Sequence, residues 1–280
     1  MTRATLAEVL QPALTGGYAV AGLVCLGWED MRAYTAAAEA LRAPVILQAG
    51  PGCRAHTPLP VLARMMGHLA DAARVPVVIH LDHARSLEEC RVALGEGFTS
   101  VMLDGSALPL AENIALTAQA SALAHGAGAS CEGEIGFVGY AGGAGSEGTD
   151  PDEAARFARE TAVDAMAVSV GNLHLQQAAG GPLDEGRLAA ISAATGVPLV
   201  IHGGSGVPHD QRQRLARDSH ICKFNIGTEL RQSFGAALRG VLARDAEVFD
   251  RLAILSTTEP EIEATARRII AELGGAGRGV

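Results

Sequence analysis

The residues of this chain that are most able to do chemistry stand where apolar runs end. The mainly apolar run 77–81 leads directly into Asp82 and His83, which a buried strand would present together at its end. Two later apolar runs lead to His174 and His202. One such histidine alone is best explained as a hydrogen-bonded structural residue, but three at equivalent places favour a divalent metal site. Imidazole suits zinc, and three protein ligands leave a fourth position for water or substrate.

Other strand ends supply further polar groups. The loop 203–206, Gly-Gly-Ser-Gly, stands between a predicted strand and a predicted helix, so its backbone N–H groups and the Ser205 hydroxyl can hold an anion. At the next strand end, Gly227 and Thr228 strengthen this interpretation, although Thr228 is explained equally well as a helix N-cap. The remaining polar residues at strand ends are Asp104, Glu132, Glu134 and Asn225.

Eight strands must position these groups, and the sequence predicts them by alternation. Short apolar or β-branched runs alternate with longer helical segments, and no break in composition marks a linker. Such alternation favours a parallel sheet, and eight units in 280 residues favour one closed (β/α)8 barrel domain over 1–280, with an open doubly wound sheet as the competitor. An extra C-terminal helical region, 246–274, follows. The predicted strands are 18–26, 44–48, 76–82, 99–103, 129–134, 164–170, 198–202 and 221–226.

Composition limits the partners and the compartment. The formal net charge of −9 argues against nucleic acid or an anionic membrane as a partner. The five cysteines are widely spaced and none forms a C-x-x-C pair, so we expect buried, reduced thiols. No signal-peptide pattern opens the sequence, and no apolar run approaches transmembrane length. We therefore expect a cytoplasmic protein that acts on small molecules.

Six segments together resemble the class II, zinc-dependent ketose-bisphosphate aldolases, in the branch of the fructose- and tagatose-bisphosphate aldolases. They occur in the order of that family and are specific as a set, although each alone is weak evidence. The resemblance implies a (β/α)8 barrel that cleaves or forms the C3–C4 bond of a ketose (bis)phosphate, releasing an aldehyde and the zinc-stabilised enediolate of dihydroxyacetone phosphate. The segments are 80–83 (HLDH), 100–106 (SVMLDGS), 132–136 (EGEIG), 168–174 (VSVGNLH), 199–206 (LVIHGGSG) and 223–229 (KFNIGTE).

The same resemblance implies a role for each residue of the site. Asp82 is implied to exchange a proton with the aldehyde-derived oxygen, and Asp104 to orient the site. A monovalent cation, Na+ or K+, is implied near the donor phosphate, and a homodimer or homotetramer as the assembly. The implied zinc ligands are His83, His174 and His202, with Glu134 as an alternative ligand. The implied contacts with the donor are Gly203, Ser205, Asn225 and Thr228.

The chemistry agrees with these implied roles. Cleavage of a C–C bond beside a ketone leaves an enediolate, and a Lewis acid stabilises its charge, so no Schiff-base lysine is needed. A carboxylate must also take the proton of the C4 hydroxyl as the bond breaks.

Several positions depart from the family pattern around the donor. Val24 replaces an asparagine, Gly50 a serine and Leu175 a glycine, which is consistent with a donor whose phosphate is smaller or absent. The family also carries a glutamate, the base at the donor carbon, at the place of Gly142. Glu147 is the replacement that we consider, on a glycine-rich lid, although an exposed loop acid explains it more simply.

Two rival hypotheses remain open from the sequence. The single lysine, Lys223, has the strand parity of Asn225 and would point into the barrel, where a buried lysine can form a Schiff base. A structural lysine paired with a barrel acid is the interpretation that we favour. The second rival is a non-catalytic subunit with an aldolase fold, which the loss of the loop glutamate would favour and the retention of Asp82 disfavours.

Overall fold

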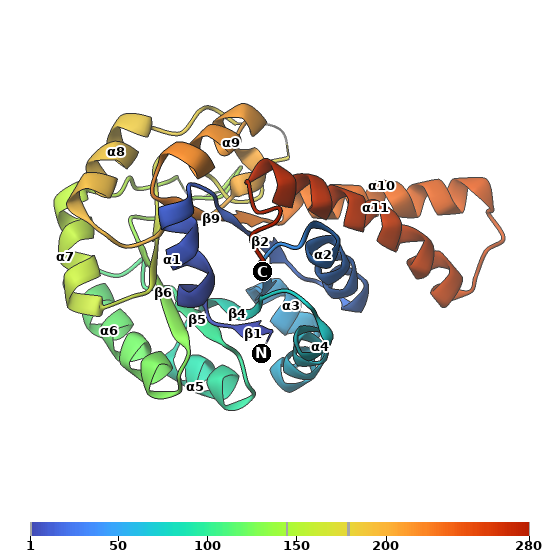
Figure 1. Cartoon of the computed structure of the whole chain (residues 1–280), viewed down its shortest axis with the longest axis horizontal. Coiled ribbons are helices and arrows are strands. Elements are labelled where there is room, and N and C mark those ends of the chain that lie inside the picture. Colours follow the sequence, from blue (N-terminus) through green and yellow to red (C-terminus); the bar gives the residue numbers. More distant parts are fainter. Residues whose placement is uncertain (1, 144, 178–179, 280) are drawn as a thin grey trace.

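Eight parallel strands close into a barrel in the computed structural model, which describes residues 2–143, 145–177 and 180–279 (Figure 1). The two-residue strand β1, Arg3–Ala4, pairs with β4 outside the ring. The predicted (β/α)8 barrel is confirmed, and the open doubly wound sheet is excluded, because β4 pairs with β5 and completes the ring. The barrel strands are β2 (Val20–Val24), β3 (Val45–Ala49), β4 (Val77–Ala84), β5 (Ser100–Leu103), β6 (Ser130–Ile135), β7 (Ala165–Val168), β8 (Leu199–Ile201) and β9 (Ile221–Ile226).

Helices surround the barrel, as expected of parallel strands that must be covered on both faces. None of the helices in the described residues is long and apolar enough to cross a bilayer. The helices before the last strand are α1 (Leu6–Gly16), α2 (Trp28–Leu41), α3 (Pro51–His56), α4 (Leu59–Ala72), α5 (Leu87–Gly95), α6 (Leu110–Gly126), α7 (Pro151–Thr161), α8 (Glu185–Ala194) and α9 (His209–Asp218).

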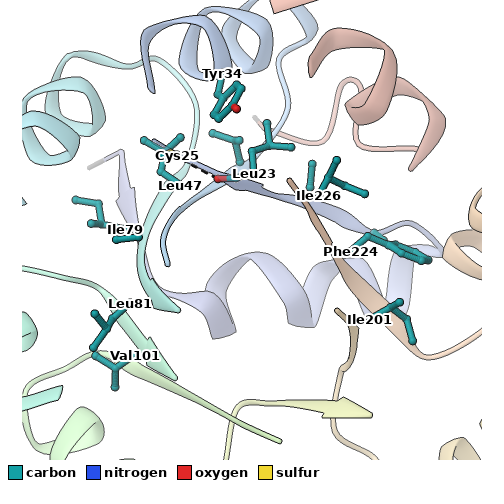
Figure 2. Close-up of a cluster of buried hydrophobic side chains, with 14 of the residues drawn as sticks. Leu23, Cys25, Tyr34, Leu47, Ile79, Leu81, Val101, Ile201, Phe224 and Ile226 are labelled. Atoms are coloured by element: carbon teal, nitrogen blue, oxygen red, sulfur yellow. Dashed lines mark hydrogen bonds between the residues drawn. The ribbon is translucent and has the colours of Figure 1, made fainter. Parts of the chain in front are cut away.

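The hydrophobic core has two parts because side chains alternate along each strand. Outward-facing residues such as Leu23, Leu47 and Phe224 pack under the helices (Figure 2). Inward-facing residues at the base of the barrel form a second cluster, into which α1 inserts Leu6 and Leu10. An apolar base closed by α1 leaves the opposite end, where the strands finish, to carry the polar groups.

Local sequence signals set several of these boundaries. The Ser86 hydroxyl accepts from the Glu89 amide at the start of α5, and α7 begins with Asp150 as N-cap and proline at the first helical position. The interpretation of Thr228 as the N-cap of α10 is wrong, because Gly227 is the N-cap and Thr228 is already helical. The short elements β1 and α3 were not predicted, since neither is long enough to show a period.

The last two helices form a hairpin that projects from the barrel (Figure 1). Helix α10 (Thr228–Arg244) leaves the end of β9, and α11 (Arg251–Glu272) returns along it and packs against α2. The predicted extra helical region, 246–274, is confirmed as α11, which follows the turn at 245–250, whereas α10 is the helix that follows the eighth barrel strand.

A buried arginine anchors the hairpin to the barrel. The guanidinium of Arg212, on α9, is fully buried and donates to Glu272 of α11 at 2.7 Å and to Glu229 of α10 at 3.1 Å. Arg268 of α11 contacts the same two carboxylates, that of Glu229 at 2.6 Å and that of Glu272 at 3.0 Å. Arg212 also lies 3.4 Å from the carbonyl oxygen of Gly204. The network therefore joins the hairpin to the loop after β8.

We expect Arg212→Met to destabilise the fold by about 3 kcal/mol, because it removes the fully buried cation from two largely buried carboxylates and leaves them only the more exposed Arg268 and His209. The measurement is the midpoint of thermal unfolding, which should fall by several degrees. Arg217→Met, an exposed change on the same helix, should leave the midpoint unchanged. An equal midpoint in both variants would contradict the anchoring role.

Candidate active site

A bulge in β4 brings Asp82 and His83 to the same cavity. Successive side chains of a regular strand point to opposite faces. Between Leu81 and Ala84, β4 carries one residue more than β5, and His83 adopts a left-handed backbone with φ 52°. The bulge turns both side chains toward one cavity of about 340 Å³ at the carboxyl ends of the strands.

Three imidazoles from distant parts of the chain meet at this cavity. His83 ends β4, His174 lies in the loop after β7, and His202 follows β8. The ring centroids of His83 and His202 lie 4.7 Å apart, those of His83 and His174 5.3 Å, and those of His174 and His202 5.6 Å. One nitrogen of each ring lies within 4.8 Å of the others. The predicted convergence of the three histidines is what the structure shows.

Carboxylates orient two of these rings. Nδ1 of His83 donates to Oδ2 of Asp104 at 2.9 Å, and Nε2 of His202 donates to Oε1 of Glu132 at 3.0 Å. Such partners fix the tautomer and leave the other ring nitrogen to bind a metal. Glu134 completes the group, and with His83 and Asp104 it forms a second, overlapping set of converging ligand atoms.

Two buried atoms at this point lack hydrogen-bond partners among the described residues. They are Nδ1 of His202 and Oε2 of Glu134, and they lie 3.3 Å apart. Buried polar atoms are nearly always satisfied, so such a pair marks a place for a ligand. A nitrogen lone pair and a carboxylate oxygen facing each other suit a cation. The donor set of imidazoles and carboxylate therefore fits a divalent metal such as zinc.

The electrostatic field at the site favours positive charge at His202 and keeps His174 neutral. Burial alone would lower the pKa of His202, but its hydrogen bond with Glu132 and the nearby carboxylate of Glu134 raise it to about 10. Burial and the two neighbouring histidines lower the pKa of His174 to about 3, which leaves its ring neutral, with one nitrogen unprotonated. Burial would raise the pKa of Asp82, but His83 and His202 outweigh it, so Asp82 is held as a carboxylate.

The layer below the histidines is a buried polar network. Nζ of Lys223 donates to Oε2 of Glu132 at 2.6 Å and lies 3.4 Å from Nε2 of His80, whose Nδ1 contacts the Ser100 hydroxyl at 2.8 Å. All four side chains are buried. Lys223 points into the barrel as expected, but it is paired with an acid and does not line the cavity. This favours the structural lysine over the Schiff base.

The glycine-rich loop and the start of α10 line the other side of the cavity. Gly203 has φ 65°, and a Cβ there would lie 2.0 Å from the carbonyl oxygen of Leu173, so only glycine fits. The Ser205 hydroxyl accepts from the amides of Gly227 and Glu229 at 3.3 Å. The predicted cradle residues Gly203, Ser205, Asn225 and Thr228 all line the cavity, together with Asp82, His83, Asp104 and His174.

Glu147 is the one predicted site residue that the structure places neither in the cavity wall nor among the converging ligand atoms beside it. Its backbone pairs with Phe137, and its side chain lines a separate cavity of about 550 Å³ with Asn113 and Glu153. Tyr140, from the same loop, lies beside the three histidines instead, because its ring stacks on His174 with centroids 4.8 Å apart. The loop thus faces the site with a phenol and not with a carboxylate.

Sequence reasoning also missed cations at the edge of the cavity. Arg85 and Arg231 line it, with Gln176. Arg231 lies three residues after Thr228 on α10, so helical spacing could have predicted that the two share a face. No pattern marks Arg85, Tyr140 or Gln176, which lie in loops.

Comparison with known proteins gives consistent results. Residues 4–278 match the family model described as fructose-bisphosphate aldolase class-II. The chain is 37% identical to 6-phospho-5-dehydro-2-deoxy-D-gluconate aldolase of Shouchella clausii, over 98% of this chain and 95% of that one. It is 36% identical to the fructose-bisphosphate aldolase of Geobacillus stearothermophilus, over 99% of both. The crystal structure of the YdjI aldolase from Escherichia coli K12 superposes with a TM-score of 0.88 at 30% identity, covering 99% of this chain and all of that one.

We expect His202→Ala to weaken the binding of Zn2+ by more than about 100-fold, since loss of a ligand should exceed the loss caused by an outer partner. Competition with a chromogenic chelator measures the affinity. His68→Ala, which removes an exposed histidine on α4, is the matched control and should bind zinc as the unmodified protein does. Equal affinities in the two variants would exclude His202 as a ligand.

Proposed function

The chain belongs to the class II fructose-bisphosphate aldolase family, and we propose that it cleaves and forms the C3–C4 bond of a ketose phosphate. The family is one of metal-dependent aldolases, so the protein is a carbon–carbon lyase. The observation that carries the proposal is the convergence of three imidazoles beside Asp82 in one cavity. The whole chain, 1–280, is proposed to act as one aldolase domain.

In the proposed mechanism the chain's own residues hold the metal, the substrate and the proton. His83, His174 and His202, with Glu134 as an alternative ligand, would hold a zinc ion, which would supply a Lewis acid for the charge of the enediolate. Asp82 takes the proton of the C4 hydroxyl as the C3–C4 bond breaks and returns it in the reverse direction. Nδ2 of Asn225, 3.4 Å from Oδ1 of Asp82, holds that carboxylate in place.

The donor phosphate is proposed to lie in the cradle at the start of α10. Gly203, Ser205 and Thr228 offer backbone amides and hydroxyls at the positive end of a long helix, which suits an anion. Na+ or K+ beside the phosphate would balance its charge. Arg85 and Arg231 at the rim suit a second anionic group on the aldehyde half of the substrate.

The names of the two relatives differ in the aldehyde half of the substrate. Both named substrates carry a ketone next to a phosphorylated carbon. Cleavage of the bond between the α and β carbons on the other side of that ketone gives dihydroxyacetone phosphate from each. They differ in the other half, which ends in a phosphate in one and a carboxylate in the other. We propose a ketose phosphate with an anionic aldehyde half.

One observation favours a second candidate, an aldolase with an altered donor. The three departures from the family pattern, Val24, Gly50 and Leu175, all line the cavity. Leu175 is 52% exposed there and has φ 59°, a conformation that glycine adopts more easily. A ketone donor with no phosphate would suit this more apolar wall. A non-catalytic subunit is disfavoured, because the predicted metal ligands and Asp82 are assembled together.

We expect the protein loaded with Zn2+ to cleave a ketose phosphate and to lose activity after treatment with EDTA. Asp82→Asn should lower kcat by roughly 10²–10⁴-fold, the usual contribution of a positioned acid or base. Asp210→Asn, in the first turn of α9, is the control and should keep full activity.

A screen of phosphorylated and non-phosphorylated ketoses, following the released aldehyde, identifies the donor. Activity that resists EDTA, with substrate trapped on Lys223 by borohydride, would support the Schiff-base rival instead.

We also propose a cytoplasmic homodimer or homotetramer. The five cysteines are all buried and unpaired, as suits a reducing compartment. The tip of the hairpin carries apolar side chains that a monomer would leave in water, since Phe249 is 92% and Leu252 76% exposed. A second copy of the chain is the partner that would cover them.

The double variant Phe249→Glu/Leu252→Glu should therefore shift the assembly toward monomer, measured by size-exclusion chromatography with light scattering. Val92→Glu on α5, an equally drastic change at an exposed site far along the chain, should leave the mass unchanged. A monomeric unmodified protein, or a double variant of unchanged mass, would disprove the role of the tip.

A further inference from the structure

The bulge that carries Asp82 and His83 exposes the backbone beneath the site. His83 has φ 52°, a left-handed conformation that is unfavourable for any residue with a Cβ. The register with β5 slips at the same place, so the carbonyl groups of these two residues lose their places in the regular ladder. Backbone carbonyls in the interior need other donors. The conformation that creates the site therefore depends on whatever supplies them.

Arg54 supplies those donors. Nη1 of its guanidinium donates to the carbonyl oxygen of Asp82 at 2.6 Å, and Nη2 donates to that of His83 at 3.1 Å. Nη1 also donates to the carbonyl oxygen of Ala49 at the end of β3. Nε donates to Oε1 of Glu89 on α5 at 2.8 Å, which fixes the plane of the fork. A single planar group thus joins the ends of β3 and β4 to α3 and α5.

Arg54 does this without touching the site itself. Its side chain is 9% exposed and lies behind the bulge, and it is absent from the residues that line the cavity. Its neighbours Pro51, Gly52 and Cys53 do line the cavity, so α3 forms part of the wall while its arginine holds the back.

We infer that Arg54 is a positioning residue, whose clamp on the carbonyl oxygens of Asp82 and His83 keeps the carboxylate and the imidazole aimed at the same point. This rests on the proposed function for its effect on turnover, but its effect on metal binding does not. The planar fork of arginine can span two carbonyl oxygens at once, which the point charge of lysine cannot. Arg54 therefore acts through geometry and not only through charge.

The test compares Arg54→Met, Arg54→Lys and Glu89→Gln with Arg64→Met, an exposed arginine on α4 that serves as the matched control. Metal-free protein is titrated with Co2+, and the visible absorption reports both affinity and coordination geometry. Arg54→Met should weaken Co2+ binding by roughly 10–100-fold and change the absorption band, as loss of an outer partner does. Arg54→Lys should lie between, and Glu89→Gln should lose less than Arg54→Met. Arg64→Met should match the unmodified protein.

Turnover gives a second reading. With an active substrate, Arg54→Met should lower kcat more than it raises KM, because the cradle for the donor is intact. If the unmodified protein cleaves none of the ketoses, the proposed function is wrong, while the Co2+ titration still decides the role of Arg54. Unchanged Co2+ affinity and absorption in Arg54→Met would overturn the inference. Should that variant fail to fold, Arg54→Lys decides instead, and Co2+ binding identical to that of the unmodified protein would overturn it.

Discussion

The interaction on which this site depends is a buried chain of charge, from Lys223 through Glu132 to His202. Lys223 and Glu132 are fully buried, and the charged atoms of the two side chains lie 2.6 Å apart. Burial alone would raise the pKa of the Glu132 carboxyl, but Lys223 and His202 outweigh it and hold that pKa below its ordinary value. A buried ion pair is not a strong source of stability by itself. Its value here is orientation, because it keeps an acceptor aimed at Nε2 of His202 and so leaves Nδ1 to face the cavity. The apolar base of the barrel supplies the stability that this polar layer does not.

The same division explains how much could be predicted. Barrel, strand ends and the three histidines could be read from the sequence, because strand ends in a parallel barrel converge by topology alone. The bulge at His83 and the clamp of Arg54 could not be predicted. The bulge depends on backbone angles, and the clamp depends on contacts of Arg54 with two residues that follow it by 28 and 29 positions in the chain. Lys223 was placed by strand parity, but only its partner showed that it is structural.

The loop after β6 shows a different limit. Residue type made Glu147 the only carboxylate to consider there, yet pairing of its backbone with Phe137 turns it toward another cavity. Tyr140 faces the site because the loop docks against the segment around His174. The Ala141 amide donates to the carbonyl oxygen of His174, and the His174 amide donates to that of Gly139. Such docking between two irregular segments follows no sequence period, so it has no signal to read.

The single lysine has one more consequence. Because Lys223 is the only lysine of the chain and its side chain is fully buried, a reagent that acylates side-chain amines finds no accessible target on the folded protein. Apart from exposed histidines, the basic side chains at the surface are guanidinium groups, which keep their charge in alkaline solution, where ammonium groups lose theirs. Attachment to a support or to a dye through lysine would therefore report unfolding, and not the native surface.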